Sequence, residues 1–234
     1  MITRNRSTQK EFLDQDNIPF DDIRLNMKEL DIINTWLGGH VVTLAGLKKL
    51  LKTYNRSNKP LHICEIGCGG GDNLRVIRQW SLRNDIDVQL TGIDKNEACI
   101  GYAADKNPER YFTWIRSDYA AVEFEEQKPD ILFSSLFCHH FSNRELVFMM
   151  KWMRNNCRIG FFINDLHRNK IAYYSIQLLT KFFSNSYLVK HDAPLSVLRG
   201  MTRREWDNIM SQAGILHFDI KWKWAYRWLI TVYS

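Results

Sequence analysis

The chain has 234 residues, of which 45% are hydrophobic and 25% charged, so it can fill the core of one α/β domain but hardly of two. Its formal net charge of +6 comes from basic residues that alternate with acidic ones and form no basic stripe, so no nucleic-acid partner is expected. The sequence contains no apolar stretch of membrane-spanning length and no apolar leader, which predicts a cytoplasmic protein without stable membrane insertion.

The cysteines are odd in number and fall in or beside predicted core segments: Cys64, Cys68, Cys99, Cys138 and Cys157. Such a set indicates reduced thiols rather than a disulfide framework. Cys64 and Cys68 lack a second pair at the spacing of a zinc site, so no metal is expected there.

Residues 1 to about 20 are polar and aperiodic, and we expect a loose tail. Apolar residues then recur with helical spacing over residues 23–37 and 41–50, on either side of the pair Gly38 and Gly39. This pattern predicts two helices with a break between them. The polar residues 55–60, which end in a proline, predict a loop before the first strand.

Residues 61–73, with the sequence Leu-His-Ile-Cys-Glu-Ile-Gly-Cys-Gly-Gly-Gly-Asp-Asn, form the most informative stretch. They predict a buried strand, a glycine turn that a ligand can approach closely, and the start of a helix. Such a turn offers backbone N–H groups and the positive end of a helix to a nucleotide-like ligand. The glycines lack the dinucleotide spacing, and Glu65 would repel a pyrophosphate but attract an ammonium group. A tight turn beside a solvated glutamate is the plain alternative.

This stretch resembles the first motif of the class I S-adenosylmethionine-dependent methyltransferases, [D/E]-x-G-x-G-x-G. The resemblance implies an α/β fold, a Rossmann-like seven-stranded methyltransferase sheet with helices on both faces and an N-terminal helical cap. It also implies S-adenosyl-L-methionine as the cofactor, with Glu65 near its methionine end and its main-chain contacts at Gly67, Gly69 and Gly71.

Residues 88–94 predict a second strand, which ends in Asp94. Ligands of doubly wound sheets bind at the carboxyl ends of the strands, where an acid about twenty residues past the glycine turn accepts both ribose hydroxyls. We therefore expect Asp94 to hold the ribose, with Lys95 beside it in the cofactor site. A helix cap at Asp94 is the alternative, because Glu97 follows at capping-box spacing.

An aromatic third strand is predicted over residues 111–115. Asp118, just past it, matches the family position that hydrogen-bonds the adenine amino group, and Tyr119 is available to pack on the adenine ring.

Residues 131–138 form a continuous apolar run, which predicts a fourth strand buried on both faces. At its end, the sequence Cys138-His139-His140-Phe141 resembles the L-H-H-[L/F] signature of the methyltransferases of ubiquinone and menaquinone biosynthesis, with a cysteine in place of the leucine. A histidine there could deprotonate a substrate hydroxyl. The alternative is that one of the two turns away to the backbone. A capping box from Ser142 to Glu145 predicts the start of the next helix.

Residues 160–168 predict a fifth strand with Asn164, Asp165 and His167 at its exit. His167 oriented by Asp165 is a second candidate base, and Asp165 could instead hold a substrate hydroxyl. Together with His139 and His140 these groups could ligate a metal. Many class I methyltransferases need none, and no metal is predicted.

The last third of the chain predicts a roof and a closing hairpin. Residues 171–189 form a strongly apolar helix, and the resemblance implies that it roofs the substrate site. Burial against the N-terminal cap is expected, with exposure to a partner or membrane surface as the alternative. Residues 191–200 predict a turn-bearing link. A capping box from Thr202 to Glu205 opens a helix that stops at Gly214. Residues 218–226 and 228–233 predict two terminal strands.

The order of elements predicts one structural domain, with a tail and cap over residues 1–59 and a core over residues 60–234 that carries a cap insertion at about 169–200. The insertion, with Asn164-Asp165-x-His167 and Ser196-Val-Leu-Arg199, loosely resembles methyltransferases beside polyketide and phenolic-lipid pathways.

We therefore expect O-methylation of a small aromatic or phenolic molecule in a secondary-metabolite or phenolic-lipid pathway, with four catalytic candidates: His139, His140, His167 and Asp165. A C-methyltransferase on a quinone precursor, or a non-methylating pathway protein such as a scaffold or cyclase, are the alternatives. A dinucleotide oxidoreductase is disfavoured, and a homodimer is left open.

Overall fold

The computed structural model describes residues 5–15, 17–53, 59–124 and 127–234. Within these residues one seven-stranded sheet has the order β3-β2-β1-β4-β5-β7-β6. The first five strands run parallel, and β7 lies antiparallel between β5 and β6. The strands are β1 Leu61–Ile66, β2 Val88–Asp94, β3 Phe112–Arg116, β4 Ile131–Ser135, β5 Gly160–Leu166, β6 Asp219–Lys223 and β7 Arg227–Tyr233.

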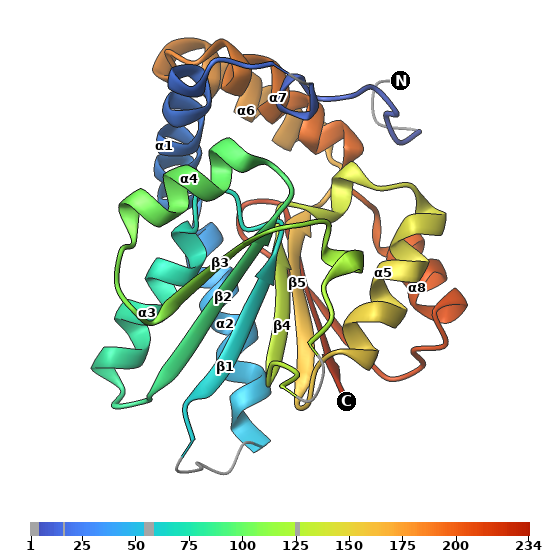
Figure 1. Cartoon of the computed structure of the whole chain (residues 1–234). Helices are drawn as coiled ribbons and strands as arrows, with labels where there is room; N and C mark the ends of the chain where they lie inside the picture. Colours follow the sequence, from blue (N-terminus) through green and yellow to red (C-terminus); the bar gives the residue numbers. More distant parts are fainter. Residues whose placement is uncertain (1–4, 16, 54–58, 125–126) are drawn as a thin grey trace.

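Helices cover both faces of this sheet (Figure 1). The apolar sides of α2 and α3 pack on one face, and those of α5 and α8 pack on the other. The helices are α1 Phe20–Trp36, α2 Gly39–Leu50, α3 Asp72–Arg83, α4 Glu97–Lys106, α5 Asn143–Asn155, α6 Lys170–Phe183, α7 Tyr187–Arg199 and α8 Arg203–Gln212.

A roof of helices lies above the end of the sheet at which the parallel strands finish (Figure 1). It consists of α1, α6 and α7, with the N-terminal segment running alongside. α1 packs on α4 and α7, so the roof is joined to the core on the cofactor side as well as behind β5. Ligands of such sheets bind at the carboxyl ends of the strands, so the roof closes over the expected site.

The expected fold is confirmed, including the seven-stranded sheet, the N-terminal helices and the helical insertion after β5. The break predicted at Gly38 and Gly39 is present, since Gly38 has a φ of 71° and α2 starts at the next residue. Both predicted capping boxes are formed, from Ser142 to Glu145 and from Thr202 to Glu205.

Two boundaries differ from the prediction. β4 ends at Ser135 rather than at residue 138, because Leu136 adopts a φ of 54° and residues 138–140 form a 3-10 turn. The predicted link over residues 191–200 is instead the second half of α7. The side chain of Ser186 caps a new helix there, and burial of its apolar side chains outweighs the cost of Pro194 in its interior.

The expected loose tail is also wrong for the described residues 5–15. The N–H groups of Phe12 and Leu13 donate to the carboxylate of Asp192, at 2.8 and 3.0 Å, and Ser7 donates its N–H to the carbonyl of Leu198. This segment is held in place by main-chain N–H groups that donate to a distant carboxylate. Such contacts leave no apolar period in the sequence, so its order could not be predicted.

The outer side of α6 is exposed, although burial was expected. Four side chains at helical spacing are more than half exposed: Ile171, Tyr174, Leu178 and Phe182. The segment is also two helices and not one, since α6 ends at Phe183 and α7 begins at Tyr187. No described helix is long and apolar enough to cross a bilayer.

Candidate active site

The glycine turn joins β1 to α3 and leaves the main chain bare. Gly67 and Gly71 have φ values of 67° and 75°, which side chains rarely adopt, and Gly71 stands at the start of α3. A Cβ atom on Gly71 would lie 2.4 Å from the ring of Trp114. Glycine is therefore required here both by the backbone conformation and by the neighbouring side chain.

Asp94, at the end of β2, holds this turn through its carboxylate. One oxygen accepts the N–H of Gly69 at 3.0 Å, and the other accepts the N–H of Asn96 at 2.9 Å. Burial raises the pKa of Asp94, although these two N–H groups oppose the shift. The alternative role as a helix cap is wrong, because the side chain of Asn96 caps α4.

Glu65 lies beside the turn, fully buried, with half of its carboxylate unpartnered. One oxygen accepts the side-chain amide of Asn73 at 2.9 Å, and the other has no hydrogen-bond partner. Burial raises the pKa of Glu65 well above its ordinary value, and the nearby Asp72 and Asp94 add to the shift. An orphaned carboxylate oxygen next to a bare turn fits the ammonium group of an amino-acid ligand, so the residues present fit the implied cofactor.

A chain of polar side chains links this end to the first two helices. The ring of His40 bridges Asp31 and Asn73, with 3.0 Å on each side, and the hydroxyl of Thr43 also donates to Asn73. Asn164 donates to the Thr43 hydroxyl and to the carbonyl of Gly39. The N-terminus of α2 is thereby fixed against the cofactor turn.

The remaining residues expected at the cofactor lie around β2 and β3. Lys95 and Asp118 are exposed, and the carboxylate of Asp118 accepts the N–H of Ala120. Tyr119 is buried, with its ring edge-on to the rings of Phe141 and Trp152. Burial among these rings raises the pKa of its hydroxyl.

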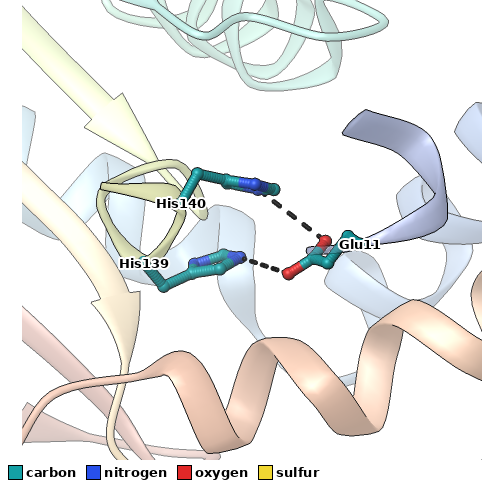
Figure 2. Close-up of side chains that lie close together, drawn as sticks. All are labelled: Glu11, His139 and His140. Carbon is teal, nitrogen blue, oxygen red and sulfur yellow. Dashed lines mark ion pairs between the residues drawn. The ribbon is translucent and has the colours of Figure 1, made fainter. Parts of the chain in front are cut away.

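Both predicted histidines turn toward Glu11, from the N-terminal segment, and neither turns away (Figure 2). The Nε2 atoms of His139 and His140 lie 3.5 and 3.8 Å from the two different oxygens of this carboxylate. On their other sides, Nδ1 of His139 lies 2.8 Å from Asp165 and Nδ1 of His140 lies 3.2 Å from Asp14. Each ring is thus held between two carboxylates.

His139 is the buried member of the pair and His140 the more open one. The side chain of His139 is 3% exposed and that of His140 is 20% exposed. Burial disfavours the charged form of His139, but Asp165 and Glu11 outweigh it and raise its pKa to about 9. The pKa values of Asp165 and Glu11 are lowered in spite of burial, because both face the histidine.

Two arginine side chains donate hydrogen bonds to the main chain of the turn that carries His139 and His140. Arg199, at the end of α7, donates to the carbonyls of His139 and His140 and to that of Gln9 in the N-terminal segment. Arg6 donates to the same His139 carbonyl and to the carbonyl of Arg199. The N-terminal segment, α7 and the end of β4 are therefore joined at this one place.

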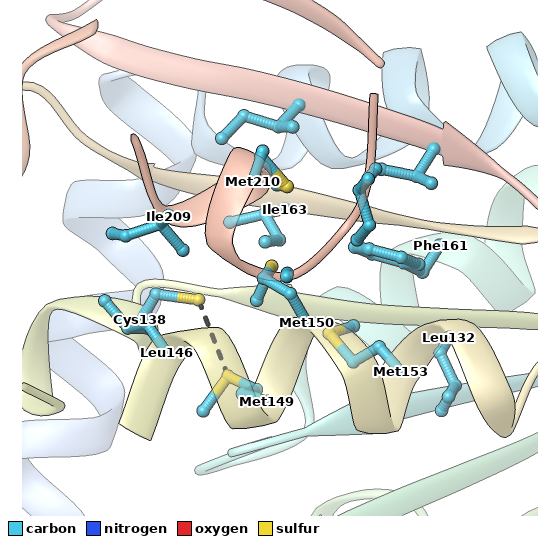
Figure 3. Close-up of a cluster of buried hydrophobic side chains, with 14 of the residues drawn as sticks. Leu132, Cys138, Leu146, Met149, Met150, Met153, Phe161, Ile163, Ile209 and Met210 are labelled. Carbon is cyan, nitrogen blue, oxygen red and sulfur yellow. Dashed lines mark hydrogen bonds between the residues drawn. The ribbon is translucent and has the colours of Figure 1, made fainter. Parts of the chain in front are cut away.

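Cys138, the residue before the two histidines, anchors their turn in the hydrophobic core (Figure 3). Its thiol is fully buried, with the sulfur 3.9 Å from that of Met149 and 3.3 Å from the hydroxyl of Ser134. All five cysteines are buried free thiols. The cysteine in place of the family leucine therefore still fills an apolar position, and it fixes where the next two side chains point.

The three polar residues at the end of β5 do not gather in one place. Asn164 points to the α2 face, where it contacts Thr43, whereas Asp165 points to the opposite face and His139. His167 lies two residues beyond Asp165, against the ring of Trp228, and its Nδ1 is buried without a partner. Burial and Arg168 lower the pKa of His167. The alternation of a strand predicts this split.

Sequence reasoning missed four residues that complete the site from a distance, and it named Arg199 only within a loose family resemblance, without a role. The four are Glu11, Asp14, Arg6 and Arg227. Arg227 is fully buried on β7, donates to Asn34 through one nitrogen, and leaves Nε and Nη1 without partners. Burial lowers its pKa to about 10. An acid in a polar tail or an arginine in a hairpin strand looks like surface in sequence, so no local signal could have found them.

Comparisons with known proteins agree with this geometry. The family model described as a methyltransferase domain matches residues 63–160, which run from β1 to the start of β5. No curated protein matches the sequence.

Several solved structures share the fold at low identity. The plantazolicin methyltransferase BpumL, solved with SAH, has a TM-score of 0.61 and 19% identity, with 87% of this chain and 74% of that one covered. Human N-acetylserotonin methyltransferase, solved with SAM, has a TM-score of 0.63 and 14% identity, covering 92% and 56%. Magnesium protoporphyrin IX methyltransferase from Synechocystis PCC 6803, solved with SAH, has a TM-score of 0.51 and 15% identity, covering 97% and 89%.

These likenesses concern the fold, and the matched domain supplies the activity class. The glycine turn and the acid at the end of β2 occur together in the matched segment, which also holds most of β1 and all of β2, β3 and β4. Residues 63–160 therefore form a methyltransferase domain, and the chain has the fold of methyltransferases that were solved with SAM or SAH.

Proposed function

We propose that this enzyme methylates a hydroxyl oxygen of a small aromatic molecule. The observation that carries the proposal is the position of His140, the open member of the histidine pair. Its ring lies 6.3 Å from that of Phe137, and the Phe137 ring lies over Gly67 so closely that a Cβ there would meet it at 2.2 Å. One aromatic side chain thus separates the cofactor turn from the histidine cluster.

The cofactor end holds its ligand by fixed groups. S-adenosylmethionine, when bound, supplies an electrophilic methyl group. Asp94 is placed to accept the ribose hydroxyls, Glu65 to accept the ammonium group, and Gly67 and Gly71 to allow close approach of the main chain. For Lys95, Asp118 and Tyr119 we keep the proposed contacts with the cofactor, although Tyr119 is packed among aromatic rings.

The histidine cluster would receive the acceptor hydroxyl. His139 is the buried member of the pair, 3% exposed against 20% for His140, so we assign His139 and Asp165 to positioning Glu11 and His140. His140 would contact the hydroxyl and take up its proton as the oxygen displaces the sulfur from the methyl group. A phenol has a pKa of about 10, so a positioned base makes the reactive anion accessible. His167, with its unpartnered Nδ1, is the second candidate for this contact.

Positioning supplies much of the rate in such a transfer. Holding the oxygen in line with the methyl group is worth on the order of 7–11 kcal/mol. The roof of α1, α6 and α7 and the anchored segment 5–15 would hold the acceptor there and exclude water. The five buried free thiols support a reducing compartment, so we also propose that the enzyme works in the cytoplasm.

A panel of phenols with labelled S-adenosylmethionine tests this proposal, with product analysis to locate the new methyl group. The proposal expects an O-methyl product, and His140→Gln should lower turnover by about 100-fold, the scale of a lost general base, with little change in affinity for adenosylhomocysteine. His217→Gln, an exposed histidine after α8, is the matched control. A C-methyl product, or full turnover in His140→Gln and His167→Gln alike, would overturn the assignment.

A further inference from the structure

We propose that Glu11, His139 and His140 form a binding site for one divalent transition-metal ion, Zn²⁺ in the first place. The three side chains come from two segments, far apart in the sequence, that the fold brings together (Figure 2). One donor atom from each lies within 4.8 Å of the other two. The site adjoins the proposed acceptor position, so the role of the ion in the reaction rests on the proposed function. The binding of the ion can be tested without it.

The distances suit a shared ion better than direct contacts. The Nε2 to oxygen separations of 3.5 and 3.8 Å exceed those of ordinary N–H···O hydrogen bonds, which lie at about 2.7–3.2 Å. Two ligands at about 2.0–2.1 Å from one tetrahedral zinc ion stand roughly 3.3 Å apart. Small side-chain shifts would therefore bring all three donors onto one ion.

The outer contacts are those of metal-bound histidines. A ligating histidine donates its other ring N–H to a carboxylate, which fixes the tautomer and aims the free nitrogen at the metal. Asp165 receives Nδ1 of His139 at 2.8 Å, and Asp14 receives Nδ1 of His140 at 3.2 Å. Glu11 is supported in turn by the hydroxyl of Ser196, 2.8 Å from Oε1. Every proposed ligand thus has a partner that holds it in place.

The donor set indicates the kind of ion. Two imidazoles and one carboxylate suit zinc or another first-row transition metal, whereas Mg²⁺ prefers oxygen ligands alone. Three protein ligands leave a coordination position open. We place that opening on the side of His140, the more exposed ligand. With the ion bound, the metal would acidify the hydroxyl in place of His140, so the base role of His140 proposed above describes the metal-free enzyme.

Metal binding can be measured without any substrate. The full-length protein would be dialysed against a chelator and titrated by calorimetry with Zn²⁺ and, separately, with Mg²⁺. Co²⁺ would be added in a parallel experiment, because its visible spectrum reports a nitrogen-rich tetrahedral site. We expect one Zn²⁺ ion per chain, a Co²⁺ spectrum of that type, a rise in unfolding temperature with Zn²⁺, and no heat with Mg²⁺.

Three variants locate the ion. Glu11→Gln and His140→Gln should weaken Zn²⁺ binding at least about 10-fold, the effect of losing even an outer-shell partner. His217→Gln, on the exposed surface, should bind as the parent does. Since Glu11 is buried, circular dichroism checks its fold, and the half-open His140 gives a second, milder test.

The outcomes separate this inference from the proposed function. Absence of stoichiometric Zn²⁺ binding by the parent protein, or unchanged binding in both Glu11→Gln and His140→Gln, overturns the metal site. Adenosylhomocysteine binding and O-methyl product formation that survive complete chelation also count against it, while leaving the proposed function intact. If the protein binds Zn²⁺ but not adenosylhomocysteine, the proposed function is overturned and the metal site stands.

Discussion

The two ends of the candidate active site are built in different ways. The cofactor end comes from one stretch of chain between Glu65 and Asp94, where a strand, a turn, a helix and a second strand follow each other. The histidine cluster joins Glu11 to His139 across most of the chain, with Arg199 linking both to α7. The first end is fixed by local geometry and the second by long-range contacts, so the two should fail separately when they are disturbed.

The largest expected effect is at the cofactor end. Asp94→Ala removes the carboxylate that holds the N–H groups of Gly69 and Asn96 and that would accept the ribose hydroxyls. Charge-assisted hydrogen bonds contribute about 1.5–3 kcal/mol each, so affinity for adenosylhomocysteine should fall by about 100-fold or more. Calorimetry measures this directly, and Asp105→Ala on the exposed side of α4 is the control. Parent-like affinity in Asp94→Ala would remove the basis for placing the cofactor here.

The second effect should be confined to the histidine end. Arg199→Met removes a buried guanidinium and leaves the carbonyls of His140 and Gln9 without this donor, which costs about 2–4 kcal/mol of the free energy of unfolding. Turnover should fall along with it, because the N-terminal segment loses its link to α7. Affinity for adenosylhomocysteine should stay within about threefold of the parent, a change of less than 1 kcal/mol.

For Arg199→Met, urea unfolding gives the free energy of unfolding, and calorimetry on the same sample gives the affinity for adenosylhomocysteine. Arg203→Met breaks an exposed pair with Asp207 and a 3.5 Å contact with the carbonyl of Ile220, and should cost less than about 1 kcal/mol. If Arg199→Met weakens adenosylhomocysteine binding as strongly as Asp94→Ala does, the two ends are not independent.

The smallest effect is a pH dependence at the cofactor end. Burial raises the pKa of Asp72, in the first turn of α3, to about 6, whereas the unfolded chain has a pKa of about 3.9. A raised carboxyl pKa stabilises the fold below pH 4, and that contribution is lost as the pH rises from about 4 to about 6.

Comparing the parent with Asp72→Asn isolates the contribution of Asp72 to the pH dependence of the free energy of unfolding. The free energy of unfolding of the variant, relative to the parent, should rise by up to about 2 kcal/mol between pH 4 and pH 7, because the asparagine never acquires the buried charge. Denaturant unfolding at a series of pH values provides the measurement. A difference that is flat with pH would show that Asp72 is not held in its neutral form.

Local patterns and the family resemblance together predicted the sheet, the glycine turn and the acid at the end of β2. The apolar runs and the glycine turn predicted β1, α3 and β2, and Asp94 follows at the end of β2 because strand, turn and helix lengths fix its position. Side-chain oxygens at Ser142 and Thr202 predicted two helix starts for the same reason, since a cap acts within four residues. Where the relevant contacts are close in sequence, the pattern is sufficient.

Only the tertiary structure decided what surrounds the histidines. Nothing near Glu11 or Arg199 in the sequence distinguishes them from surface charges, yet both are buried against the turn at His139 and His140. The outer side of α6 is the opposite case. Its apolar residues predicted burial, but no described element covers that side. Burial and charge pairing depend on which distant segments come into contact, and a local sequence pattern does not specify those contacts.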